Sequence, residues 1–157
     1  MTRSTAREIA VHCSYTIGFT GQSPEEILEE RLNRDNFLNW KDEDAIYAEY
    51  PNEKQQQYIK ELVNGVGKHA PELDEYIAQY AVNWKFARIP RISTAIMRVA
   101  MYEILYMPQI PNATAINEAV EIAKKYEEQK MVSFINGILG AFVRAEFPNE
   151  TPEKPIK

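Results

Sequence analysis

The chain has 157 residues, of which 45% are hydrophobic and 26% charged, and its formal net charge is −5. This composition is typical of a globular protein rather than of a disordered chain, and at this length one domain with a hydrophobic core is the default. The acidic balance argues against a protein that coats nucleic acid through a general basic field, although it allows a local basic patch.

The sequence gives no sign of membrane insertion or export. No apolar run approaches the roughly 18 residues of a membrane span, and the N-terminus lacks the apolar stretch of a signal peptide. The single cysteine, Cys13, cannot form an internal disulfide, which fits a reducing compartment. We therefore expect a cytoplasmic protein without membrane contact.

Helical periodicity dominates the first part of the chain. The first helix is expected to start at Ser4 or Thr5 and to stop near Gly21, and the second to start from a Ser23 cap. Between residues 33 and 51 the pattern breaks, and aromatic residues are scattered among charges. We interpret this segment as a loop with at most one helical turn; its aromatic residues are Phe37, Trp40, Tyr47 and Tyr50.

The second part of the chain continues in the same manner. A helix is expected over residues 52–69, and Pro71 is expected to open a separate short helix. Ser93 is the expected cap of the next helix, and a further helix is expected to begin beyond Pro111. No run with β alternation competes with this interpretation.

The last helix is expected over residues 131–147, ended by Pro148. The sequence thus predicts an all-α fold of about seven helices, with one domain over residues 1–148. The tail, residues 149–157, is expected to be disordered.

Catalytic and metal-binding patterns are sparse. His12 and Cys13 are consecutive on a helix, so their side chains diverge by about 100° and cannot act as base and nucleophile. No spacing resembles a zinc site, a phosphate loop or a dinucleotide fingerprint. Glu118 and Glu121 lack an accompanying Glu-x-x-His motif and fit a solvated face or a contact with a partner. We expect no enzyme, no cofactor and no metal site.

Five segments together resemble the NusB family of transcription antitermination factors. They are "AREIAVHCSY", "YIKELVNGV", "RIPRISTAIMRVAMYEIL", "TAINEAVEIAKKY" and "SFINGILG", in that order. The resemblance covers residues 3–147 apart from an insertion over 33–54. The fold also resembles the RNA-binding domain of a ribosomal RNA cytosine methyltransferase. Because the chain ends where that catalytic domain would start, the stand-alone factor is expected to be the better match.

The resemblance implies two stacked three-helix subdomains. It also implies a complex with NusE, a protein of the small ribosomal subunit, and binding of single-stranded boxA RNA in nascent ribosomal RNA. Within the transcription elongation complex, this assembly would help RNA polymerase to read through terminators. The resemblance leaves open whether the free protein forms a homodimer.

Candidate RNA-binding residues lie near both ends of the chain. Arg3 and Arg7 are four apart on one face of the first helix, where they could reach phosphates or bases or remain solvated. The resemblance places Lys130 near RNA, together with Ser133 and Phe134. Phe134 lies at the edge of a core stripe and could equally stack on a base or belong to a second buried face.

The resemblance points to Tyr15 and Glu103 as contacts for NusE. Glu103 could pair with a basic residue there, whereas Tyr15 could instead pack in the core. Asn117 and Asn136 are expected to form buried hydrogen bonds, and Gly137 and Gly140 to allow close helix packing; all four are assigned to structure.

Two other functions remain open. An RNA-modifying enzyme that works through this helical domain would need a cofactor site. A protein interaction scaffold without RNA binding is favoured by the acidic balance.

Overall fold

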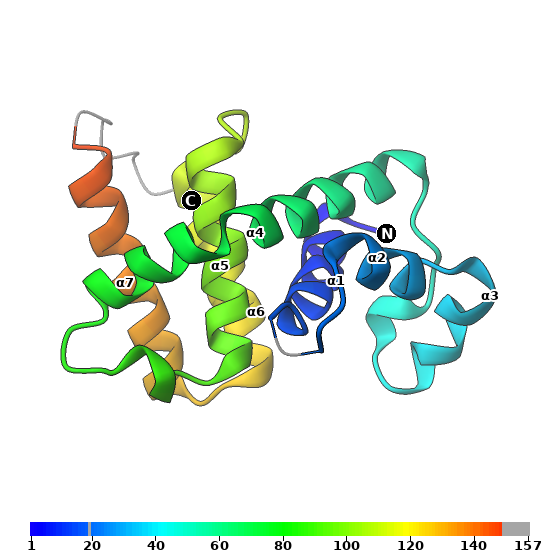
Figure 1. Ribbon diagram of the computed structural model, residues 1–157, viewed down its shortest axis with the longest axis horizontal. Coiled ribbons are helices and arrows are strands. Elements are labelled where there is room, and N and C mark those ends of the chain that lie inside the picture. The colour runs from blue at the N-terminus through cyan, green and yellow to red at the C-terminus, as the bar shows by residue number, and fades with distance from the viewer. Residues whose placement is uncertain (19, 149–157) are drawn as a thin grey trace. The chain divides into compact units, whose positions relative to one another are not determined.

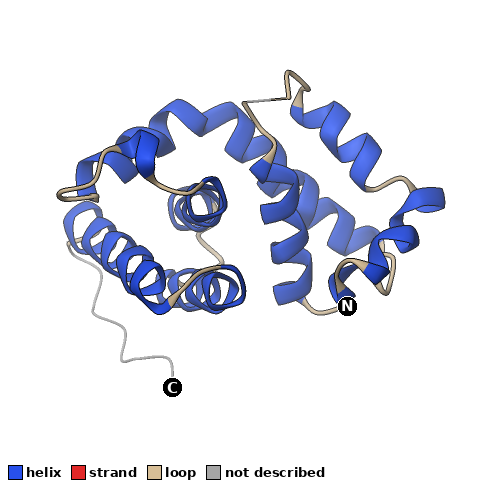
Figure 2. Cartoon of the chain, turned by 90° about the horizontal axis from the view of Figure 1, so that it is seen from below, coloured by secondary structure: helices blue, strands red, loops and turns tan. Residues whose placement is uncertain are grey.

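The computed structural model describes residues 1–18 and 20–148, and the tail expected to be disordered lies outside them. Within these ranges there are seven α-helices, three 3₁₀-helices and no strand, so the all-α prediction is confirmed. Figure 2 shows helices joined by loops. The chain divides into two compact units, Met1–Lys68 and the part from His69 onward. The expectation that residues 1–148 form one domain remains a prediction.

Helix α1 (Arg3–Tyr15) opens the first unit. It starts slightly earlier than expected because Thr2, not Ser4 or Thr5, is the cap: the Thr2 hydroxyl accepts a hydrogen bond from the Thr5 N–H at 3.0 Å. It also ends well before Gly21. The Thr16 hydroxyl donates to the Cys13 carbonyl at 3.0 Å, competing with the helical ladder, and the chain then turns away.

Helix α2 (Pro24–Arg31) begins where the sequence predicts. Ser23 accepts from the Glu26 N–H while the Glu26 carboxylate accepts from the Ser23 N–H, which completes a capping box. Pro24 approaches helix α4 (Glu53–Tyr80) so closely that a Cβ atom added at Gly67 would lie 2.4 Å from its ring.

The segment expected to be a loop is more ordered than predicted. It holds α3 (Arg34–Phe37) and two 3₁₀-helices, η1 (Leu38–Asp42) and η2 (Ala45–Tyr47). Phe37 is fully buried, and the rings of Tyr47 and Tyr50 each pack edge-on to it at 5.1 Å. Contacts between distant aromatic residues order this segment, and local periodicity cannot reveal them.

The expectation that Pro71 opens a new helix is wrong. Helix α4 runs through it without interruption, as Figure 1 shows. Proline removes one backbone donor, yet the buried residues Val66, Leu73 and Ile77 keep helical spacing across it. Burial of this apolar face compensates for the lost hydrogen bond.

The second unit contains the end of α4, then η3 (Phe86–Arg88), α5 (Arg91–Tyr106), α6 (Asn112–Tyr126) and α7 (Gln129–Glu146). Helices α5, α6 and α7 pack pairwise into a three-helix bundle. Arg98 on α5 clamps Asp74 on α4 through two hydrogen bonds of 2.7 Å. As predicted, α6 follows Pro111, whereas α7 starts before Met131.

Several residues assigned to structure lie elsewhere than expected. Ser93 does not cap α5, whose N-cap position is Pro90; it is buried and donates to the Glu127 carboxylate, joining α5 to the end of α6. Asn117 and Asn136 are exposed, so they form no buried bridge between helices.

The expectation of close helix packing at two glycines of α7 is wrong. Gly137 is exposed, and no described atom lies within 4 Å of a Cβ added there. At Gly140 the three atoms nearest to an added Cβ all belong to Arg144, which is part of the same helix.

Candidate nucleic-acid interface

Two aromatic side chains pair near the surface of the second unit. The ring centroids of Trp84 and Phe134 are 4.8 Å apart, with the planes tilted by 42°. Trp84 is 36% exposed and Phe134 is half-buried. Phe134 thus packs against the ring of Trp84 and keeps part of its surface exposed. A partly exposed aromatic pair is suited to stacking on unpaired bases.

The turn after α4 places Trp84 in this pair. Asn83 adopts a positive φ of 70°, a conformation that asparagine tolerates better than most residues. The Trp84 N–H then donates to the Ala81 carbonyl at 3.2 Å. The sequence interpretation missed Trp84, because no local signal announces a partner fifty residues further along the chain; a large aromatic residue in a turn was the only hint.

Basic side chains lie on the same two segments. Lys130 is exposed in the first turn of α7, and Lys85 and Arg88 are exposed just after Trp84. Ser133 is also exposed, and its hydroxyl accepts a hydrogen bond from the Gln129 side chain at 3.2 Å. We call the set of Trp84, Lys85, Arg88, Lys130, Ser133 and Phe134 the Trp84–Phe134 surface.

The two arginines of α1 occupy different environments. As expected, they share a helix face, and both guanidinium groups lie over the ring of Tyr58, with Cζ at 4.2 Å from the centroid for Arg3 and 5.7 Å for Arg7. Arg3 is exposed, but Arg7 is only 3% exposed. Arg7 is therefore buried within the first unit beside Tyr58, where its guanidinium cannot reach a phosphate without rearrangement.

The two residues expected to contact a protein partner also differ. Tyr15, at the end of α1, is 38% exposed. Glu103, on α5, has no exposed surface. Its carboxylate is therefore not presented to a partner in the way that the sequence suggests.

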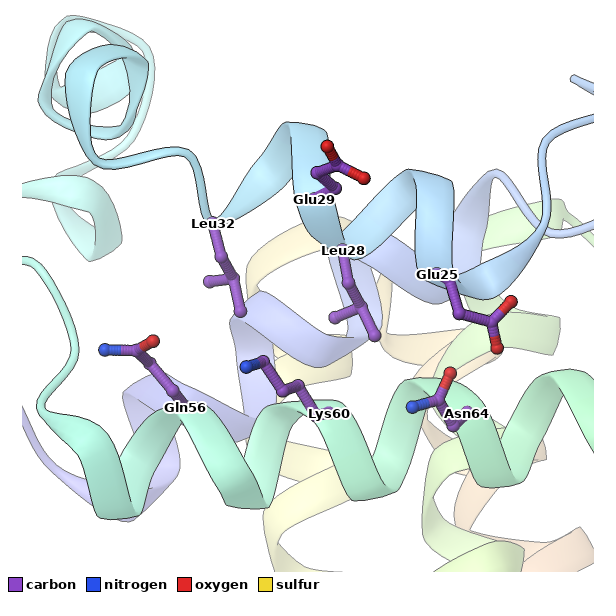
Figure 3. Close-up of a pocket in the computed structure, with 7 residues that line it drawn as sticks. All are labelled: Glu25, Leu28, Glu29, Leu32, Gln56, Lys60 and Asn64. Atoms are coloured by element: carbon purple, nitrogen blue, oxygen red, sulfur yellow. The ribbon is translucent and has the colours of Figure 1, made fainter.

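A groove in the first unit offers little chemistry. It has a volume of about 400 Å³ and lies between α2 and α4. In Figure 3, Leu28 and Leu32 point from α2 toward α4, whereas Glu29 points away. The α4 side is lined by Gln56, Lys60 and Asn64. This lining lacks a paired nucleophile and base.

Among the described helices, none is long and apolar enough to cross a membrane.

The described residues form an all-helical fold that carries the Trp84–Phe134 surface. The model of the NusB family matches residues 4–144, which is most of the chain. The protein therefore belongs to the NusB family.

Relatives of known name support this assignment. The transcription antitermination protein NusB of Thermoanaerobacter sp. (strain X514) is 42% identical, over 93% of each chain. That of Ruminiclostridium cellulolyticum is 35% identical, over 99% of this chain and 98% of the relative. Both relatives are named as transcription antitermination proteins, in agreement with the expectation of a non-enzymatic protein.

Solved structures show the same fold. T. maritima NusB superposes with a TM-score of 0.77 and 26% identity, over 96% of each chain. The crystal structure of antitermination factors NusB and NusE in complex with dsRNA gives a TM-score of 0.74 at 23% identity, over 91% of this chain and 96% of that one. At that lower identity the likeness is one of fold.

Proposed function

We propose that this protein is a transcription antitermination factor that binds single-stranded boxA RNA together with NusE, in the cytoplasm. The observation that carries the proposal is the Trp84–Phe134 pair with lysine and arginine on the same segments. Membership of the NusB family supports it, as does the fold shared with a NusB that was crystallised with NusE and RNA. Bound within the elongation complex, the assembly would help RNA polymerase to pass terminators.

The Trp84–Phe134 surface has the two features that single-stranded RNA requires. Its aromatic rings are partly exposed and can each receive a splayed base, since every base has a π face. Lys85, Arg88 and Lys130 can neutralise phosphates beside the stacked bases. In the first unit, we assign Arg3 to RNA and give Arg7 the positioning role of ordering Tyr58 beneath it.

For NusE, we assign the direct contact to Tyr15, because a partly exposed tyrosine offers apolar area and a hydroxyl at low entropic cost. Glu103 is buried, so we assign it a structural role in α5 rather than a direct contact with NusE.

The proposal can be tested by titrating boxA RNA with the full chain in the presence of NusE. We expect sequence-dependent binding that falls roughly five- to a hundredfold in Trp84→Ala or Phe134→Ala, the range for losing one stacked base. Tyr106→Ala is the matched control, since Tyr106 is 39% exposed in the same unit but lies outside the Trp84–Phe134 surface.

Two outcomes would contradict the proposal. Equal binding of boxA and a scrambled RNA would remove the sequence-specific function. Capture of NusE without any RNA binding would instead select the scaffold function that the acidic balance favours. Sedimentation of the free chain tests in parallel whether it forms a homodimer.

A further inference from the structure

Three potential metal ligands converge in the first unit, and none of them is among the residues that we assign to RNA. One ligand atom each from Glu8, His12 and Asp44 lies within 4.8 Å of the other two. All three residues are neither fully buried nor fully exposed, so an ion could reach them from solvent.

The fold brings these residues together from two segments. Glu8 and His12 are four apart on α1 and therefore share one helix face. Asp44 comes from the aromatic segment, where it caps η2 by accepting a hydrogen bond from the Ile46 N–H at 3.1 Å. That bond fixes the position of the Asp44 side chain opposite α1.

A contact with Tyr47 orients the imidazole ring of His12. Its Nδ1 lies 2.7 Å from the hydroxyl of Tyr47, which also accepts a hydrogen bond from Arg31 at 3.0 Å. This contact at Nδ1 orients the ring, so an ion in the cluster would bind His12 through Nε2.

We propose that Glu8, His12 and Asp44 bind a divalent transition-metal ion, with Zn²⁺ as the best fit. Two carboxylate oxygens and one imidazole nitrogen form a donor set that suits Zn²⁺ better than Mg²⁺ or Ca²⁺, and water would complete the coordination. Ligand atoms around Zn²⁺ lie roughly 3.3 Å apart, so pairs of ligand atoms would approach one another by up to about 1.5 Å.

Two neighbouring groups limit the site. Cys13 is fully buried and diverges from His12 by about 100°, so it is not a fourth ligand. The Arg31 guanidinium, which contacts Tyr47, opposes a cation and weakens the affinity. The ion would join α1 to η2 and so stabilise the first unit.

The test uses the full chain, treated with a chelator and then titrated with Zn²⁺ alone in a calorimeter. We expect one ion per chain and a rise in melting temperature. Asp44→Asn, which keeps an oxygen for the Ile46 N–H, and Glu8→Gln should each weaken binding at least about tenfold. Co²⁺ should give visible d–d bands without a thiolate charge-transfer band.

The matched control is His69→Asn. His69 is the other of the two histidines and also lies near a carboxylate, with Nδ1 at 3.4 Å from Glu72. This variant should bind Zn²⁺ as the parent does, and circular dichroism verifies the fold of every variant.

The proposal is overturned by the absence of saturable binding up to about 1 mM Zn²⁺. It is also overturned if binding persists unchanged in both carboxamide variants, or disappears in the His69 variant. In each of these cases Glu8, His12 and Asp44 form an ion-pair cluster only.

Discussion

Gly67 lies in the interior of α4, where an added Cβ atom would come within 2.4 Å of the Pro24 ring. Gly67→Ala should therefore lower the free energy of unfolding. Overpacking costs about 1–3 kcal/mol and the better helix propensity of alanine returns up to about 1 kcal/mol, so we expect a net loss of about 1–2 kcal/mol in urea denaturation.

Gly137→Ala is the matched control, because Gly137 is also in a helix interior but has open space where its Cβ would lie. Without a clash, only the propensity term remains, and we expect a gain of about 0.5–1 kcal/mol. If both alanine variants were stabilised, the close approach of α2 to α4 would be contradicted.

At the scale of elements, a single hydrogen bond ties the end of α4 to the end of α7. The Tyr80 hydroxyl donates to the Glu146 carboxylate at 2.6 Å, and this bond is the main reason that the pKa of Tyr80 rises from 10.0 to about 12. Because the folded state disfavours the phenolate, the bond stabilises the protein fully below about pH 10. That contribution is lost as the pH rises through about 12.

Glu146→Gln should bring the pKa of Tyr80 back toward 10, since it removes both the charged acceptor and the nearby negative charge. A titration of the tyrosine Cζ resonances by ¹³C NMR measures the change. Tyr106 is the internal control: its hydroxyl donates to Glu72, its pKa is also raised to about 12, and it should not respond. Equal shifts in both tyrosines would contradict the assignment of the effect to the Glu146 bond.

Sequence periodicity predicts most of these elements but not their limits. The repeating apolar stripe revealed the long helices, yet the same stripe runs through Pro71 and joins two expected helices into α4. Thr2 rather than Ser4 caps α1. A sequence pattern cannot distinguish neighbouring hydroxyl residues as helix caps, since only the backbone geometry decides between them.

Contacts between distant residues account for what the sequence could not predict at the candidate site. Phe134 was singled out, but its partner Trp84 becomes apparent only when the turn at Asn83 is formed. The burial of a side chain also depends on residues that are distant in the sequence. Arg7 shares a face with Arg3 as predicted, but it is buried beside Tyr58 from α4.

At the scale of the whole molecule, a chain of net charge −5 must bind an anionic polymer through few cations. Arg3, Lys85, Arg88 and Lys130 are the exposed basic residues that we assign to RNA. If each of these four neutralises one phosphate, they contribute a slope of about −3 to the plot of log K against log salt concentration. Stacking on Trp84 and Phe134 must then supply a large share of the affinity, and that share is insensitive to salt.

Measurements of RNA binding over a series of KCl concentrations separate these two contributions. Lys130→Gln should make the slope shallower by about 0.7, the value for one phosphate on a single strand, whereas Trp84→Ala should lower affinity at every salt concentration without changing the slope. All variants are measured at the same NusE concentration, so the contribution of the basic residues of NusE to the slope is the same in each and cancels in the comparison. Lys124→Gln is the control, since Lys124 pairs with Glu121 on α6 and should leave the slope unchanged. A slope that changed in Trp84→Ala but not in Lys130→Gln would reverse the roles assigned to the two kinds of side chain.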